Sequence, residues 1–285
     1  MSRNKNRTGA KMPDNTPPPN LTQEQDNTGG GFSFVVPTEF VDLPSRGHFY
    51  PEGHPLCGQD SIEIKQMTAK EEDLLTSRTL LKKGVALDRL IQSLIVNKSI
   101  DAEALLTGDR NAILIASRVS AYGNIYNTQI TCPACGEAQK YDFDLNEAHI
   151  YHGDDTSDVE FTNNGNGTFV TVLPRTQITA HFKILTGYDE KQFTRLFIDK
   201  KTRKDDQLVT NHLRNILVQV NEHTSAEAVN YVVENIPSVD ARHLRRAYSR
   251  ATPNVDLTQY FECIACDHEE QLEVPLSADF FWPDR

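Results

Sequence analysis

The amino-acid sequence predicts an α+β fold with a helical N-terminal half, a middle region made of a β-hairpin plus helices, and a closing element built from two cysteine-bearing hairpins. Three observations predict this class. Apolar residues recur at helical spacing between residues 68 and 123, and an Asn- and Gly-rich run at 163–167 separates two strand-like segments. Two Cys-x-x-Cys pairs lie in matching, strand-like surroundings.

We expect five regions in chain order. Residues 1–31 are rich in Pro, Gly, Asn and Gln and hold few apolar residues, which predicts a disordered N-terminal tail. Residues 32–124 should form an N-terminal strand plus a helical region, and residues 125–147 a first knuckle hairpin. Residues 148–256 should form an inserted β-hairpin and helical region. Residues 257–285 hold the second knuckle and an aromatic C-terminus.

The elements before the first knuckle follow from alternation, capping and apolar spacing. Strands are expected at Phe32–Val36 and Ser61–Lys65. Thr68 and Glu71 have the spacing of a capping box and predict that a helix begins there. Three further helices are expected at Leu87–Ile95, Asp101–Leu106 and Asp109–Gly123.

The middle region begins with a hairpin, in which Val159–Thr162 and Thr168–Val172 flank the turn-forming run. Ile178–Ile184 is expected to add a strand. Four helices should follow. They are predicted at about Asp189–Lys200, at Val209–Val220, behind the capping box Thr224–Glu227, and at about Asp240–Arg250.

The four paired cysteines have the pattern of a metal site. They are Cys132, Cys135, Cys263 and Cys266. Zn²⁺ binds four thiolates in a tetrahedron. A zinc ribbon typically contains two copies of one pattern, in which a Cys-x-x-Cys turn joins two strands. The sequence therefore predicts a structural zinc with no open coordination position. Because 127 residues separate Cys135 from Cys263, this ribbon is split by a large insertion.

Two alternatives to one intramolecular site remain open. The pairs could be separate redox or buried cysteines, although neither opens the helix of a βαβ unit. Two chains could also each supply one pair to a shared site.

Composition restricts the classes of partner. The net charge of the 285-residue chain is −11 and its pI is about 5.3, so no global positive field attracts nucleic acid or an anionic membrane. Apolar runs are too short for a membrane span, and the N-terminus has no apolar signal-peptide core. The paired cysteines suggest a reducing compartment.

No catalytic motif accompanies the cysteines. The sequence has no phosphate-binding loop, dinucleotide-binding turn, His-Glu-x-x-His helix or nucleophile elbow, so we expect no enzyme. The last predicted helix carries a basic cluster that could contact an acidic partner surface or form a solvated helix face. Its members are Arg242, Arg245, Arg246 and Arg250. The aromatic run Phe280–Trp282 should either seal the ribbon against the body or anchor another subunit.

Several segments in order resemble one known family. They are Leu43–Pro51, Ile62–Glu71, Leu106–Arg110, Tyr122–Gly123, Cys132–Gly136, Cys263–Cys266 and Phe280–Pro283. This set resembles the baseplate protein family of T4-like contractile-tailed phages, associated with the baseplate hub. The resemblance covers about residues 35–285 and carries no catalytic residues.

The resemblance implies a structural or assembly component of the central hub, made late in infection, whose partners are other baseplate hub proteins. Such a protein would lie in the host cytoplasm during assembly or in the tail baseplate of the virion. The alternative is a zinc-ribbon regulator that binds nucleic acid through its arginines, and the net charge of −11 counts against it.

Overall fold

The structure is a computed structural model that describes residues 35–153, 158–192, 208–274 and 278–281. The α+β class is confirmed, because helices alternate along the chain with small antiparallel sheets. The predicted tail at 1–31 lies outside the described residues. None of the described helices combines the length and the hydrophobicity that a membrane span requires.

The N-terminal half is not the helical region that was predicted. Its first described elements are two antiparallel strands, β1 (Thr38–Asp42) and β2 (Ser61–Lys65), joined by a long turn-rich connection. The expected strand at Phe32–Val36 lies mostly outside the described residues, and Val35 and Val36 precede β1 as coil. The segment 43–60 stays non-helical because its Pro and Gly residues favour turns, and its backbone groups bond within those turns.

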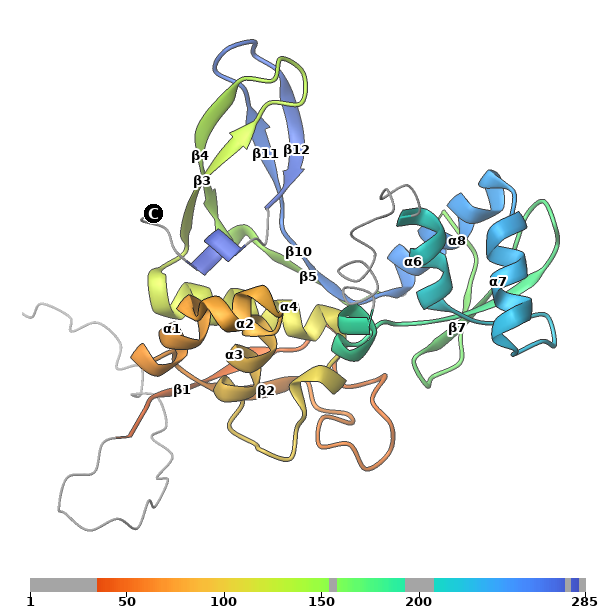
Figure 1. Cartoon of the computed structure of the whole chain (residues 1–285), viewed down its shortest axis with the longest axis horizontal. Coiled ribbons are helices and arrows are strands. Elements are labelled where there is room, and N and C mark those ends of the chain that lie inside the picture. The colour runs from red at the N-terminus through yellow and green to blue at the C-terminus, as the bar shows by residue number, and fades with distance from the viewer. Residues whose placement is uncertain (1–34, 154–157, 193–207, 275–277, 282–285) are drawn as a thin grey trace, which may run out of the picture.

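Helices follow these strands in the chain. They are α1 (Ala69–Thr76), α2 (Arg78–Lys82), α3 (Ala86–Leu94), the 3₁₀ turn η1 (Ala102–Ala104) and α4 (Thr107–Tyr122). The start of α1 confirms the predicted capping box, because the Glu71 carboxylate accepts from the Thr68 backbone N–H at 3.1 Å. Helix α4 lies centrally and contacts β1, α3 and the C-terminal segments (Figure 1).

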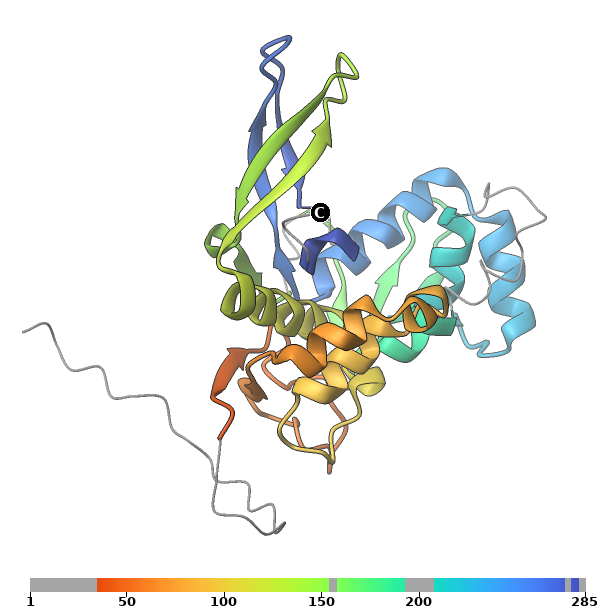
Figure 2. The same cartoon turned by 60° about the vertical axis from the view of Figure 1, so that its left-hand side comes forward.

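The two knuckle hairpins lie side by side and project from the body as one arm (Figures 1 and 2). One hairpin pairs β3 (Ile125–Thr131) with β4 (Ala138–Asp144), and the other pairs β11 (Thr258–Glu262) with β12 (Glu269–Glu273). We call these four strands and their two turns the arm. The 3₁₀ turn η2 (Leu145–Glu147) follows β4. Strand β5 (His149–Tyr151) then pairs with β10 (Asn254–Asp256), which brings both ends of the inserted region together.

The inserted region forms a lobe with a four-stranded antiparallel sheet. Its strands, in sheet order, are β6 (Thr162–Asn163), β7 (Thr168–Val172), β8 (Thr179–Lys183) and β9 (Leu217–Val220). Three helices pack on this sheet, namely α6 (Leu208–Ile216), α7 (Ala226–Asn235) and α8 (Ser238–Ala251). Residues 187–192 are helical, and the rest of the helix predicted to reach Lys200 lies outside the described residues.

One predicted helix is too long. Val209–Val220 was expected to be helical throughout, but the helix ends at Ile216 and Leu217–Val220 becomes the strand β9. The apolar residues of Leu217–Val220 fit both the period of a helix and that of a strand. Pairing with β8, where Ala180 lies opposite Val220, decides for the strand.

Candidate metal centre

The structure brings the four predicted cysteines together at the end of the arm. Their Sγ atoms all lie within 4.8 Å of one another. Two contacts cross between the hairpins: Cys132 Sγ lies 3.8 Å from Cys266 Sγ, and Cys135 Sγ lies 3.7 Å from Cys263 Sγ. Of the described residues, these four form the one cluster of potential metal ligands.

The two knuckles share one backbone geometry. In the first, Gly136 N–H donates to the Cys132 carbonyl at 2.9 Å; in the second, Asp267 N–H donates to the Cys263 carbonyl at 2.9 Å. Gly136 and Asp267 both have positive φ angles, of 77° and 52°. Each turn therefore buries its first cysteine and leaves its second exposed, so two thiols from each hairpin converge on the same point.

The donor set fits Zn²⁺. A tetrahedral zinc with Zn–S bonds of about 2.3 Å requires sulfur atoms about 3.8 Å apart, which matches the two cross-hairpin distances. Zn²⁺ accepts four thiolates and leaves no position for a catalytic water in such a site. The site can thus join two hairpins but offers no Lewis-acid chemistry to a substrate.

The electrostatics also favour a cation. Backbone N–H groups, above all that of Cys135, lower the pKa of Cys132 to about 6. The N–H of His268 lowers the pKa of Cys266, but the neighbouring thiols outweigh it and raise that pKa to about 12. The first thiolate forms readily and the last does not, because like charges repel at this separation. A divalent cation supplies the charge that allows all four to ionise.

Two buried glutamines join the hairpins along the arm. Gln139 on β4 donates to the Glu262 carbonyl at 3.0 Å and accepts from Ile264 N–H at 3.0 Å. Gln259 on β11 donates to the Asp144 carbonyl at 2.7 Å and accepts from Asp144 N–H at 3.1 Å. Each amide therefore satisfies backbone groups of the opposite hairpin. Neither residue stands out in the sequence, because only the pairing of the hairpins shows what their amides contact.

The C-terminal aromatics pack against the body at the base of the arm. Phe280 and Phe281, in the 3₁₀ turn η3 (Ala278–Phe281), are almost fully buried, and the Phe280 ring lies 5.1 Å from that of Tyr126. The buried Arg118 donates to the carbonyls of Phe280 and Gly123, each at 2.7 Å. Of the two predicted roles, sealing the ribbon against the body is the one these two rings perform, and Trp282 lies outside the described residues.

Two segments that carry the family resemblance meet at a buried carboxylate. Asp109, in the first turn of α4, accepts from Ser45 N–H at 3.0 Å, from the Ser45 hydroxyl at 2.6 Å and from the Tyr50 hydroxyl at 2.7 Å. Burial raises the pKa of Asp109. Gly108 allows α4 to pass close to the chain before β10, because a Cβ there would lie 2.1 Å from the Pro253 carbonyl oxygen. These residues hold the connection 43–60 against α4.

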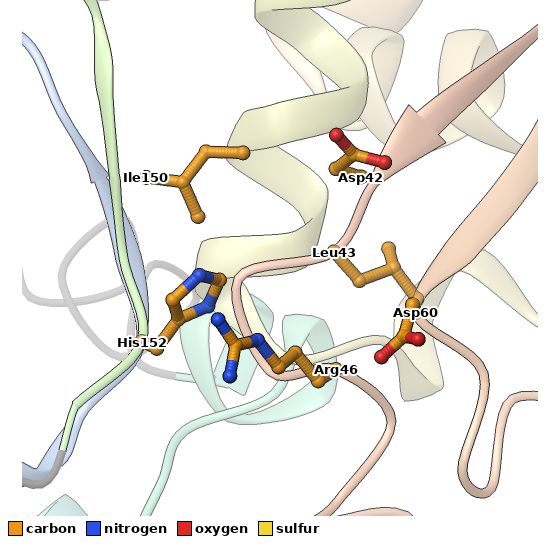
Figure 3. A pocket seen from close by; sticks show the side chains of 6 residues that line it. All are labelled: Asp42, Leu43, Arg46, Asp60, Ile150 and His152. Carbon is orange, nitrogen blue, oxygen red and sulfur yellow. The ribbon is translucent and has the colours of Figure 1, made fainter.

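A cavity of about 410 Å³ opens between this connection and β5. Figure 3 shows the side chains of Asp42, Arg46, Asp60, Ile150 and His152 around it. The arginine lies in an unusual backbone position for its type, since its φ is 49° and the following Gly47 has φ 67°.

No acid–base pair forms among the described residues of this cavity. The His152 ring contacts the Pro44 carbonyl through Nδ1 at 2.9 Å, and neither Asp42 nor Asp60 is bonded to it.

The predicted arginine cluster on α8 divides into two parts. Arg246 and Arg250 both form ion pairs with Asp158, with Arg250 Nε at 3.2 Å from the carboxylate. Arg242 and Arg245 are exposed, and neither forms an ion pair with a carboxylate in the described part of the chain. Ion pairs within the described residues therefore neutralise only half of the cluster.

Comparison with known proteins identifies a family. The model of the family described as "T4 bacteriophage base plate protein" matches residues 37–282, which is most of the chain. No curated protein and no solved structure matches it. The match includes all four cysteines, the Asp109 contacts and the buried Phe280 and Phe281. The chain belongs to the T4 bacteriophage base plate protein family.

Proposed function

We propose that this chain is a structural or assembly component of the central baseplate hub of a contractile phage tail. The observation that carries the proposal is the family match over residues 37–282, which supports a structural role in the phage baseplate. The side-chain contacts agree with it, because Asp109 and Gln139 hold a loop and a hairpin in place. The chain acts as a scaffold without catalytic activity.

The proposed scaffold holds one structural Zn²⁺ on Cys132, Cys135, Cys263 and Cys266. The sulfur–sulfur distances of 3.7 and 3.8 Å support this ligand set. The ion fixes the two hairpins of the arm against each other and so stabilises a preformed surface, which lowers the cost of ordering on assembly.

The partners we propose are other baseplate hub proteins, met in the host cytoplasm during assembly or in the virion tail baseplate. The exposed Arg242 and Arg245 on α8 suit an acidic surface on such a partner. The nucleic-acid alternative gains no support, since the many carboxylates of the arm would repel the phosphates of a nucleic acid.

Reconstitution tests the hub role. The purified full chain, with its metal content measured, is mixed with individually purified hub proteins of the same phage, and complexes are separated by size-exclusion chromatography with light scattering. A stable complex with at least one hub protein is expected. A chain that binds none of them, and whose removal from the phage genome leaves tail assembly unchanged, would contradict the proposal.

A further inference from the structure

One face of α8 is an unpaired basic surface with an apolar residue at its end. Arg242 and Arg245 are exposed without an ion-pair partner among the described residues, and Val239, one turn earlier, is 62% exposed. The backbone N–H of Arg175 donates to Asp240 at 2.7 Å, which places a third exposed arginine beside the same end of the helix. We call Arg175, Val239, Arg242 and Arg245 the α8 face.

The arm carries a negative charge, opposite to that of the α8 face. Residues 125–144 and 258–273 contain eight carboxylates and one lysine, Lys140, a net charge of −7 out of −11 for the whole chain. Seven of these carboxylates are exposed, namely Glu137, Asp142, Glu262, Asp267, Glu269, Glu270 and Glu273. Among the described residues of the arm, the one ion pair joins Glu270 to the nearby His268. The negative charge of the arm is therefore left almost uncompensated.

The end of the arm adds an apolar contact. Ile264 lies in the second knuckle between Cys263 and Cys266, and it is 83% exposed. Glu262 and Glu269 lie directly opposite each other on β11 and β12, next to this knuckle. An exposed isoleucine with carboxylates beside it is thus complementary to an exposed valine with arginines beside it.

We propose that the arm of one copy binds the α8 face of a second copy. The arm and the lobe project from the body in different directions, and no described ion pair joins them within one chain (Figures 1 and 2). The two surfaces therefore meet between copies. Because the contact joins two different patches, it is heterologous and leads to a ring if it closes and to a filament if it does not.

This inference rests on the proposed contact of Arg242 and Arg245 with an acidic surface, and it identifies that surface as the arm of a second copy. Association competes with the repulsion between chains of net charge −11, so it depends on short-range pairing at the contact. High salt should weaken it, because the screening length falls from about 10 Å at 0.1 M to about 3 Å at 1 M.

Charge reversal tests the contact on the full-length, zinc-loaded chain. One variant carries Glu262→Lys and Glu269→Lys on the arm, and another carries Arg242→Glu and Arg245→Glu on α8. Light scattering and sedimentation should show concentration-dependent association of the parent, and each variant alone should associate at least about 100-fold more weakly. An equimolar mixture of the two variants should associate again, as should a chain with all four changes.

The control for the arm variant reverses two exposed glutamates outside the arm, Glu52→Lys and Glu222→Lys. It changes the net charge by the same amount as the arm variant does. This control should associate at least as well as the parent. A parent that stays monomeric, an arm variant that associates like the parent, or a four-change chain that stays monomeric would each overturn the proposal. Binding to a hub protein is measured separately on the arm variant, which keeps Arg242 and Arg245, so failure of the self-association leaves the proposed function to its own test.

Discussion

Replacement of Cys263 by serine tests whether one ion joins the two halves of the arm. Cys263 Sγ is buried and lies 3.7 Å from Cys135 Sγ on the other hairpin. Serine has nearly the same shape but a hydroxyl that does not ionise near neutral pH, so the variant keeps the packing and loses one ligand. We expect zinc to bind much more weakly and the arm to open.

The size of the effect follows from the chain that the metal closes. An ion held by both pairs closes a loop with 127 residues between Cys135 and Cys263. A covalent link across about 100 residues removes about 4.7 kcal/mol of loop-closure entropy from the unfolded chain. Since the ion makes an equivalent link through two pairs of bonds, loss of its attachment to one hairpin should cost about 4–5 kcal/mol.

The assay compares zinc per chain, molar mass and thermal unfolding for the parent, Cys263→Ser and Cys57→Ser. Cys57 is an exposed thiol outside the cluster, so its replacement controls for the loss of a cysteine. One zinc per monomer is expected in the parent and in Cys57→Ser. A Cys263→Ser chain with unchanged zinc content and melting temperature would refute the shared site, and zinc that is lost when the parent is diluted to monomers would show that two chains supply the ligands.

Three further changes probe the supports of the arm and body. Asp109→Asn should lower the free energy of unfolding by about 1–3 kcal/mol in chemical denaturation, because an amide cannot accept from all three donors that face the carboxylate. Adding Ser45→Ala to this variant should cost little more, because the two residues share one interaction. Arg118→Lys should lower the free energy of unfolding by about 3 kcal/mol and speed amide exchange at Phe280, because one ammonium cannot reach both carbonyls that the guanidinium contacts. Unchanged exchange at Phe280 would contradict the role given to Arg118 in holding the C-terminal segment. Burial raises the pKa of Glu71, but hydrogen bonds from Ser93, Thr68 and Lys65 outweigh this and lower it to about 2. Its contribution to stability is therefore complete above its unfolded pKa of about 4.3 and lost as the pH falls toward 2, so Glu71→Gln should flatten the dependence of melting temperature on pH in that range.

Local patterns in the sequence were sufficient for elements with strong signals of their own. The capping box at Thr68 and the Leu and Ile spacing near α3 predicted helices that the structure contains, because capping and amphipathic spacing act within one or two turns. The alternation at Ser61–Lys65 likewise predicted β2. The prediction failed at Leu217–Val220, where a neighbouring strand and not the local sequence decides the conformation.

The same distinction holds for the candidate site. The spacing and flanking strands of the cysteine pairs predicted four converging thiols, because a Cys-x-x-Cys turn has a fixed local geometry. Nothing local indicated Gln139, Gln259 or Arg118, whose partners lie more than 100 residues away or across the base of the arm. Polar side chains of this kind acquire a role only when folding removes water from them and presents backbone groups to bond.

The sequence by itself determined the α+β class, the cysteine pairs, most helices and the segments by which the family is recognised. Only the tertiary structure decided that the arm gathers most of the negative charge, and that Asp158 engages Arg246 and Arg250 while Arg242 and Arg245 stay available. The physical reason is that periodicity and capping depend on near neighbours in the chain. Charge complementarity and burial depend on which distant segments fold against each other.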